Sequence, residues 1–188
     1  MKEIIKDVPF YEQSGGGVTF SGGEPFVYAD FLLEILTRCK KECIHTVIDT
    51  SGFCDTEVLL KAAKIADCFL YDVKFFNREK HEKYCGASNE QILENLKCLS
   101  REKTKILIRI PVIPAVNDDL AEMTAIYNFI KDLGNIEIVH LLPYHDIHGD
   151  KYRRLEMQYE LSGIPKESQN MNEIEGIFKS KFRTRVGG

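Results

Sequence analysis

The hydrophobic pattern of the chain alternates between two periods. Short apolar, β-branched runs predict strands at residues 18–20, 45–50, 68–74, 106–113 and 136–142. Between them, apolar residues recur at helical spacing within residues 29–43, 56–66, 91–99, 119–133 and 171–178. The run at 106–113 is almost continuously apolar, as in a parallel strand covered on both faces. This order predicts one α/β domain over residues 1–188, with five parallel strands, and both a doubly wound sheet and a partial (β/α) barrel are compatible with it.

Local signals predict where several helices begin and end. Asp55 or Thr56 is expected to cap one helix, and Ser88-x-x-Gln91 resembles a capping box for the next. Asp118 or Asp119 is expected to begin the fourth helix, and Gly134 to follow its end as the C′ residue. Pro165 is expected to stand at the start of the last helix.

Polar side chains follow the apolar strands at their carboxyl ends. In parallel α/β proteins these ends meet at one rim of the sheet, where ligands bind. The sequence therefore predicts one site built from five strands. Its expected members are Ser21-Gly22-Gly23-Glu24, Asp49-Thr50-Ser51, Asp72 with Lys74, Arg109, and Tyr144-His145.

Each charged member of this set also has a structural interpretation. Asp49 would cap the turn that follows it, and Asp72 would form a local ion pair with Lys74, with which it shares a strand face. Arg109 interrupts an apolar strand and requires either a carboxylate partner, such as Asp72, or a bound anion. His145 would cap a loop. Five such groups at one rim favour a binding site over five separate structural roles.

The glycine-rich stretch at residues 14–25 is the most specific local motif. It reads Ser-Gly-Gly-Gly-Val-Thr-Phe-Ser-Gly-Gly-Glu-Pro, a strand followed by a turn whose glycines let a ligand approach the main chain. It is no phosphate-binding loop, because the glycine spacing differs and no Lys-Ser or Lys-Thr follows.

This stretch closely resembles the radical S-adenosylmethionine enzymes that activate glycyl radical enzymes, such as the pyruvate formate-lyase activating enzyme. The Asp72-x-Lys74 spacing and the Leu-Leu-Pro-Tyr-His run at residues 141–145 match the same family, so the resemblance covers nearly the whole chain. It implies a partial, TIM-like (β/α) barrel of normally six strands. The first strand and its cluster loop are expected to be missing, which leaves about five strands.

The resemblance also implies roles for individual residues. Gly22, Gly23 and Glu24 would offer acceptors to the α-ammonium group of S-adenosylmethionine, and Lys74 would hold its carboxylate. Further cofactor contacts would come from Asp49, Thr50, Asp72, Arg109 and His145. Asp49, Thr50 and Asp72 would in addition bind a monovalent cation.

The cysteines do not match the cluster motif of that family. The family holds a [4Fe-4S] cluster with C-x-x-x-C-x-x-C, whereas Cys39-x-x-x-Cys43 has Thr46 at the third position and lies on a helical stripe that indicates core packing. We therefore expect the cluster ligands to be absent and the chain alone to be inactive. The six cysteines are expected to be reduced thiols: Cys39, Cys43, Cys54, Cys68, Cys85 and Cys98.

The activity that the resemblance implies is reductive cleavage of S-adenosylmethionine, which places a radical on a backbone glycine of a partner enzyme. A glycyl radical enzyme and an electron donor such as flavodoxin or ferredoxin are the expected partners. One alternative is a cluster-less module that binds S-adenosylmethionine or a partner. A more distant one is a barrel lyase that uses Lys74 as a Schiff-base amine, although Asp72 would keep that amine protonated.

Composition limits the remaining function classes. The net charge of −4 and the pI near 5.8, with scattered lysines and arginines, give no nucleic-acid footprint. No apolar run approaches the length that spans a membrane, and the amino terminus has no signal-peptide pattern. We therefore expect neither nucleic acid nor a membrane as a partner, and a cytoplasmic location.

Overall fold

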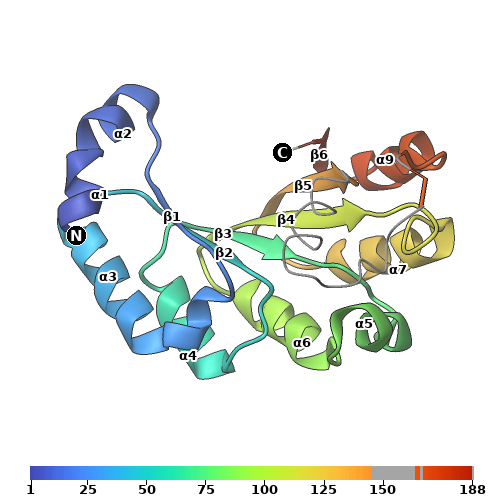
Figure 1. The fold of residues 1–188 in the computed structure, drawn as a ribbon, viewed down its shortest axis with the longest axis horizontal. Coiled ribbons are helices and arrows are strands. Elements are labelled where there is room, and N and C mark those ends of the chain that lie inside the picture. The colour runs from blue at the N-terminus through green and yellow to red at the C-terminus, as the bar shows by residue number, and fades with distance from the viewer. Residues whose placement is uncertain (145–163, 166, 188) are drawn as a thin grey trace, which may run out of the picture.

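The fold is a curved parallel sheet with helices along its outer face (Figure 1). The computed structural model describes residues 1–144, 164–165 and 167–187. Six strands pair in the order in which they occur along the chain, and every pair is parallel. They are β1 (Val18–Phe20), β2 (Thr46–Thr50), β3 (Cys68–Asp72), β4 (Lys105–Val112), β5 (Ile136–Pro143) and β6 (Arg183–Val186).

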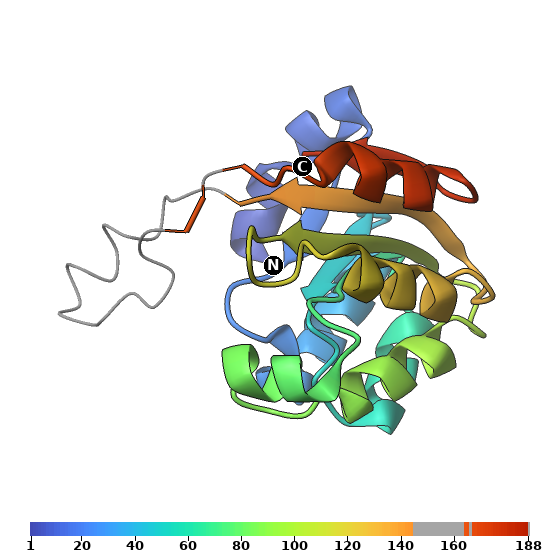
Figure 2. The same ribbon diagram turned by 90° about the vertical axis from the view of Figure 1, so that its right-hand side faces the viewer.

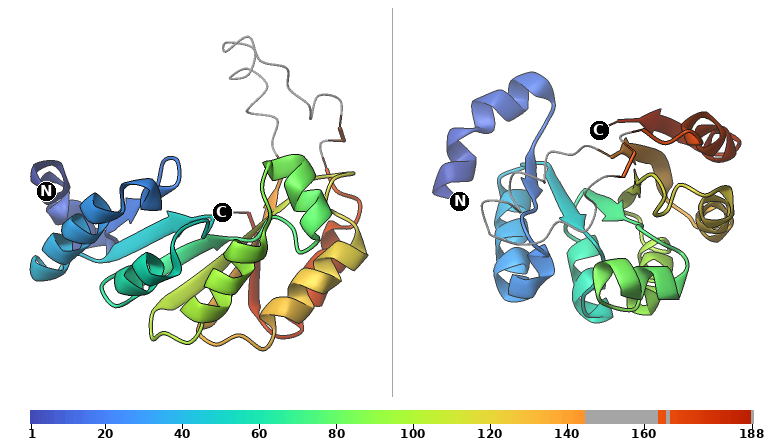
Figure 3. Two further views of the ribbon diagram at one scale, coloured as in Figure 1. Left: turned by 90° about the horizontal axis from the view of Figure 1, so that it is seen from below. Right: turned by 45° about the vertical axis from the view of Figure 1, so that its right-hand side comes forward.

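The helices form an arc around the convex side of the sheet, from α3 in blue to α9 in red (Figure 3, right). This arrangement of sheet and helices is that of a partial barrel, which confirms the predicted fold class. The helical elements within the described residues are α1 (Lys2–Lys6), α2 (Val8–Ser14), the 3-10 helix η1 (Pro25–Tyr28), α3 (Ala29–Lys41), α4 (Thr56–Ala63), α5 (Arg78–Cys85), α6 (Glu90–Leu99), α7 (Leu120–Ile130) and α9 (Met171–Lys179).

The central strands bury one face more completely than the other. In β4, Ile106, Ile108 and Ile110 are fully buried in the cluster that also contains the helix side chains, whereas Leu107 and Arg109 are only partly buried. Because side chains alternate along a strand, the second set lies on the concave face. The prediction of cover on both faces was therefore wrong. The concave face can hold polar side chains.

Two of the predicted helix starts are confirmed. Asp55 accepts hydrogen bonds from two amides of the first turn of α4, and Asp119 accepts one from Glu122 N at 2.9 Å. The predicted capping box at Ser88 was wrong. Asn89 precedes α6, and its side chain bonds to the main chain of another loop.

Three further expectations at helix ends or along the helices were wrong. The last helix begins at Met171 rather than at Pro165, and Gly134 does not adopt the left-handed conformation, which Asn135 takes instead. Cys39 is buried as predicted, but Cys43 is exposed, because α3 ends at Lys41.

Two elements gave no usable signal in the sequence. Strand β6 is the sixth where five were expected; its four residues, Arg-Thr-Arg-Val, are mostly exposed at the sheet edge. Helix α5 is so rich in charged residues that His81 is its one buried residue. Both elements are positioned by neighbours. Strand β6 pairs with β5 and lies beside α9, which packs against α7 (Figure 2). Helix α5 is held by the ion pair of Lys80 with Asp119 and by the stacking of Tyr84 on Phe75.

The amino-terminal helices cover a second, smaller core next to β1. The buried part of this core consists of Ile35 and Cys39 of α3 and of Ile44, which follows that helix. The amino-terminal helices pack against it with the side chains of Met1, Ile4, Val8 and Tyr11. Within the described residues, none of the helices is long and apolar enough to cross a membrane.

Gly52, in the loop after β2, provides a test of the packing beneath this loop. Its φ is +76°, and an added Cβ would lie 1.7 Å from the Tyr71 hydroxyl oxygen, which itself donates to Ile92 O. Gly52→Ala should therefore lower the free energy of unfolding by about 2–4 kcal/mol, from backbone strain and overpacking together. Urea unfolding followed by circular dichroism measures this change.

Gly176→Ala is the matched control for Gly52→Ala. Gly176 lies inside α9, and an added Cβ would meet nothing within 4 Å. The substitution should stabilise the chain by about 0.5–1 kcal/mol, because alanine loses less backbone entropy in a helix. Equal effects of the two substitutions would contradict the packing at Gly52.

Candidate active site at the carboxyl ends of the strands

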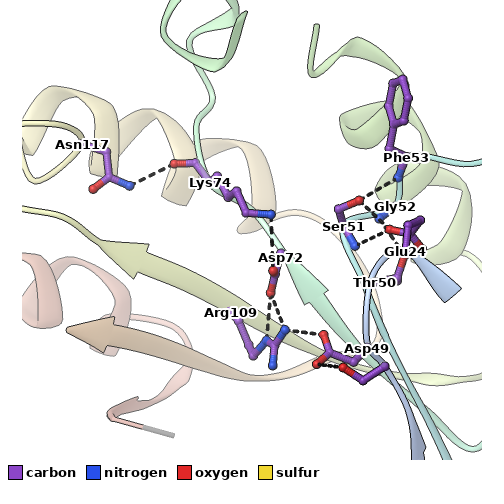
Figure 4. A network of polar contacts seen from close by, with 11 residues as sticks. Glu24, Asp49, Thr50, Ser51, Gly52, Phe53, Asp72, Lys74, Arg109 and Asn117 are labelled. Atoms are coloured by element: carbon purple, nitrogen blue, oxygen red, sulfur yellow. Dashed lines mark hydrogen bonds and ion pairs between the residues drawn. The ribbon is translucent and has the colours of Figure 1, made fainter. Parts of the chain in front are cut away.

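The predicted site residues converge at the carboxyl-terminal rim of the sheet (Figure 4). Register explains the arrangement, because Asp72 of β3 pairs directly with Arg109 of β4, while Asp49 of β2 lies opposite Leu70 of β3. Asp49, Asp72 and Arg109 therefore occupy neighbouring positions on the concave face. His145, which was also predicted for this site, lies outside the described residues.

Arg109 is held between two carboxylates. Its Nε donates to Asp72 Oδ1 at 2.8 Å, and its Nη2 donates to Asp49 Oδ1. The three side chains are only 17–24% exposed, so these charges are largely removed from bulk water. The pairing expected from the apolar surroundings of Arg109 is confirmed, with two carboxylate partners instead of one.

Lys74 extends this chain of charges toward solvent. Its Nζ lies 3.5 Å from Asp72 Oδ2, an ion pair too long for a good hydrogen bond, and its side chain is 38% exposed. No hydrogen bond of this ammonium group is found within the described part of the chain. The donors of Lys74 are therefore available to an anionic ligand.

Glu24 ties the loop after β1 to the loop after β2. One oxygen of its carboxylate accepts from Thr50 Oγ1 at 2.6 Å, and the other accepts from Ser51 N at 3.0 Å and Ser51 Oγ at 2.6 Å. A longer contact of 3.5 Å comes from Phe26 N. The carboxylate is thus engaged within the protein, and it fixes the position of the turn that precedes it.

The turn itself is open. An added Cβ at Gly22 or Gly23 would meet no atom within 4 Å, and Gly22 has a φ of +119°, which favours glycine. Within the described residues, no hydrogen bond reaches the carbonyl oxygens of these two glycines. They are available as acceptors for a cationic ligand group.

A cavity of about 460 Å³ adjoins the charged residues. Lys74 and Asp72 lie on its polar side, and Phe53 and Ile92 contribute apolar walls. A mixed lining of this kind suits a ligand that has a charged end and an apolar body.

The thiols do not form a metal centre in the described part of the chain. No group of three His, Cys, Asp or Glu side chains there could hold a metal ion. Burial, followed by the charges of Glu24 and Asp55, raises the pKa of the Cys54 thiol to about 12, and burial chiefly raises that of Cys68 to about 11. Such thiols are poor sources of the thiolate that binds iron.

Two of the expected rim residues act through other members of the site. Ser21 Oγ donates to Asp49 Oδ2 at 3.1 Å, and Ser51 binds Glu24 as described above. One residue that shapes the site, Asn117, was not singled out from the sequence. Asn117 hydrogen-bonds the main chain of Lys74. Nothing in the sequence around Asn117 distinguishes it from an ordinary turn residue.

Comparison with known proteins identifies the group to which the chain is similar. The family model for the radical SAM superfamily matches residues 1–127. The chain is 44% identical to the trans-4-hydroxy-L-proline dehydratase activating enzyme of Clostridioides difficile, over all of the chain and 64% of that enzyme. It is 36% identical to the pyruvate formate-lyase 1-activating enzyme of Escherichia coli (strain K12), over 95% of the chain and 74% of the enzyme.

Solved structures agree with this similarity. A domain of the pyruvate-formate lyase-activating enzyme from Bacteroides vulgatus superposes with a TM-score of 0.77 at 31% identity, over 92% of this chain and 99% of that one. A radical SAM methyltransferase from Sphaerobacter thermophilus, at 12% identity and a TM-score of 0.70, shares the fold. The chain spans 64% of the Clostridioides difficile relative and 54% of the choline trimethylamine-lyase activating enzyme of Oleidesulfovibrio alaskensis, to which it is 38% identical.

The bridge formed by Arg109 can be tested through stability. Arg109→Gln leaves Asp49 and Asp72 side by side without their shared cation, and should lower the free energy of unfolding by about 1–3 kcal/mol. Arg38→Gln, which breaks an exposed pair with Glu34 on α3, should change it by no more than about 0.5 kcal/mol. Urea unfolding at neutral pH measures both, and a loss at Arg109 as small as that at Arg38 would contradict the bridge.

Proposed function

Because the chain belongs to the radical SAM superfamily and, within it, to the activating enzymes of glycyl radical enzymes, we propose that its rim binds S-adenosylmethionine and that the whole protein activates a glycyl radical enzyme. The observation that carries this proposal is the arrangement of Lys74. Lys74 lines the cavity beside the rim, and its ammonium group has donors left over beyond the 3.5 Å ion pair to Asp72.

The charges of the site fit this cofactor. Glu24, Asp49 and Asp72 contribute three carboxylates and Arg109 and Lys74 two cations, so the cluster carries one formal negative charge. S-adenosylmethionine carries an ammonium, a sulfonium and a carboxylate group, and so one formal positive charge. Opposite net charges at a partly desolvated rim attract each other.

We assign separate tasks to the residues of the rim. Lys74 binds the carboxylate group of the cofactor. The carbonyl oxygens of Gly22 and Gly23 accept hydrogen bonds from the ammonium group of the cofactor. Glu24 acts mainly by holding this turn against Thr50, because its carboxylate is already engaged. The resemblance adds a contact of His145 to the adenosyl group.

A monovalent cation at Asp49, Thr50 and Asp72 remains part of this proposal. It would compete with Arg109, whose guanidinium binds one oxygen of each of the two carboxylates.

When bound beside an iron–sulfur cluster, S-adenosylmethionine supplies a 5′-deoxyadenosyl radical after one-electron reduction, and the electron would come from a flavodoxin or ferredoxin. The described residues do not fit the cluster, because no three of their thiols gather in one place. We therefore assign to this chain the binding and orientation of the cofactor, and no step at iron.

Binding of S-adenosylmethionine to the chain tests the role of Lys74. Lys74→Met should weaken binding by roughly 10- to 100-fold, the loss expected when a charge-assisted hydrogen bond of about 1.5–3 kcal/mol is removed. Isothermal titration calorimetry with the 188-residue chain measures the affinity. Lys83→Met, in the exposed turn of α5 next to Tyr84, is the matched control and should bind as tightly as the unchanged chain.

The proposal is wrong if the unchanged chain takes up no S-adenosylmethionine at millimolar concentration. It is also wrong if the Lys74 and Lys83 variants bind equally well, since Lys74 would then not contact the cofactor.

Anaerobic reconstitution with iron and sulfide provides a separate test of the cluster assignment. The chain alone should acquire no stoichiometric [4Fe-4S] cluster and should not cleave S-adenosylmethionine under reducing conditions, because no three of its described thiols lie close enough together to hold iron. Iron analysis, visible absorption and chromatography for 5′-deoxyadenosine measure the outcome. A full cluster together with 5′-deoxyadenosine would contradict the assignment.

A further inference from the structure

The turn between β3 and α5 is held by side chains instead of by its own main chain. Residues 74–76 of this turn make no main-chain hydrogen bond with one another or with the other described residues. Lys74, which we propose as a cofactor contact, is the first residue of this turn. Something other than regular secondary structure must therefore fix its position.

Asn117 provides the first part of this support. Its side chain is fully buried, and its Nδ2 donates to Lys74 O at 3.0 Å (Figure 4). The same Nδ2 donates to Pro111 O at 2.6 Å. Its Oδ1 accepts from Ile113 N at 2.7 Å. One amide group thus joins the turn after β3 to the end of β4, the strand that carries Arg109.

Two more buried polar side chains hold the rest of the turn. Asn89 Nδ2 donates to Phe75 O at 3.0 Å and to Phe76 O at 2.8 Å. Glu122 Oε1 accepts from Phe76 N at 2.5 Å and from Asn77 N at 3.0 Å. Asn89 is 2% exposed and Glu122 5% exposed, so these bonds lie in a region of low dielectric, where they are strong.

Apolar packing anchors this turn at one residue, Phe75, which is buried and stacks on Tyr84 of α5. Helix α5, which follows it, contributes one buried residue, His81, so it anchors the turn weakly. Burying three polar side chains carries a desolvation cost that apolar residues would avoid. The bonds of these side chains converge on four consecutive residues that begin with Lys74, which indicates a requirement for an exact main-chain position there.

We propose that Asn117 is a positioning residue that directs the Lys74 ammonium group toward the cofactor carboxylate, an inference that rests on the proposed function of the rim. Of the side chains of Asn89, Asn117 and Glu122, that of Asn117 is the one that hydrogen-bonds Lys74 itself. Asn117 also hydrogen-bonds the main chain of Pro111 and of Ile113, at the end of β4. It therefore fixes the position of Lys74 relative to the paired residues Asp72 and Arg109.

Asn117→Asp tests this role with little change in shape. The carboxylate keeps the acceptor for Ile113 N, but it places an oxygen against the carbonyl oxygens of Lys74 and Pro111. Binding of S-adenosylmethionine should weaken roughly 5- to 20-fold. This is the loss in affinity expected when about one hydrogen bond to the cofactor is no longer well aligned. Binding of 5′-methylthioadenosine, which lacks the amino-acid end, should not change. Calorimetry with the 188-residue chain measures both ligands.

A double-mutant cycle separates positioning from general stability. If Asn117 acts through Lys74, the Asn117→Asp and Lys74→Met double variant should bind no more weakly than Lys74→Met alone. Asn135→Asp is the matched control. Asn135 also donates its amide to two carbonyl oxygens, those of Ser100 and Glu102, near the amino-terminal end of β5, and this variant should leave both affinities unchanged.

The possible outcomes separate the role of Asn117 from the proposed function of the rim. If Lys74→Met removes the preference for S-adenosylmethionine but Asn117→Asp keeps it, Asn117 does not position Lys74. Equal losses for both ligands, or additive losses in the cycle, would show a purely structural role. If the unchanged chain does not prefer S-adenosylmethionine over 5′-methylthioadenosine, the proposed function itself fails. Should Asn117→Asp fail to fold in a thermal melt, Asn117→Ser replaces it in every comparison.

Discussion

The pairing of one guanidinium with two carboxylates is the interaction on which the rim depends. Arg109 interrupts an apolar strand, and a cation there is tolerated only when counter-charges reach it. Asp72 reaches it from the directly paired position of β3, and Asp49 from one strand further away. The three strands must therefore be parallel and in this register. A shift of one residue would turn a charge of this group toward the helices.

The loops that follow the strands are ordered by buried or partly buried polar side chains. Glu24 fastens the turn after β1, and Asn95 donates to Gly52 O and Cys54 O, both at 2.8 Å, in the loop after β2. Asn117 and Glu122 do the same after β3. Loops rich in ligand-facing groups have few internal hydrogen bonds, so their rigidity must come from neighbouring elements.

The chain is similar to part of the length of longer relatives. It is 44% identical to one activating enzyme while spanning 64% of its length, and the described residues hold no group of three metal-binding side chains. The charged rim and the open Gly22-Gly23 turn are both suited to the same kind of ligand. Both can be explained by recognition of a ligand with a carboxylate at one end and cationic groups near it.

The sequence by itself determined the α/β class, the parallel order, the first five strands and the rim residues Gly22 to Arg109, because periodicity and local motifs depend on neighbours along the chain. Strand β6 and helix α5 were missed, since tertiary contacts stabilise them against weak local signals. Only the tertiary structure decided that Arg109 has two partners and that Asn117 supports Lys74. Those contacts join residues 37 to 60 positions apart, and no local pattern encodes a distance across the sheet.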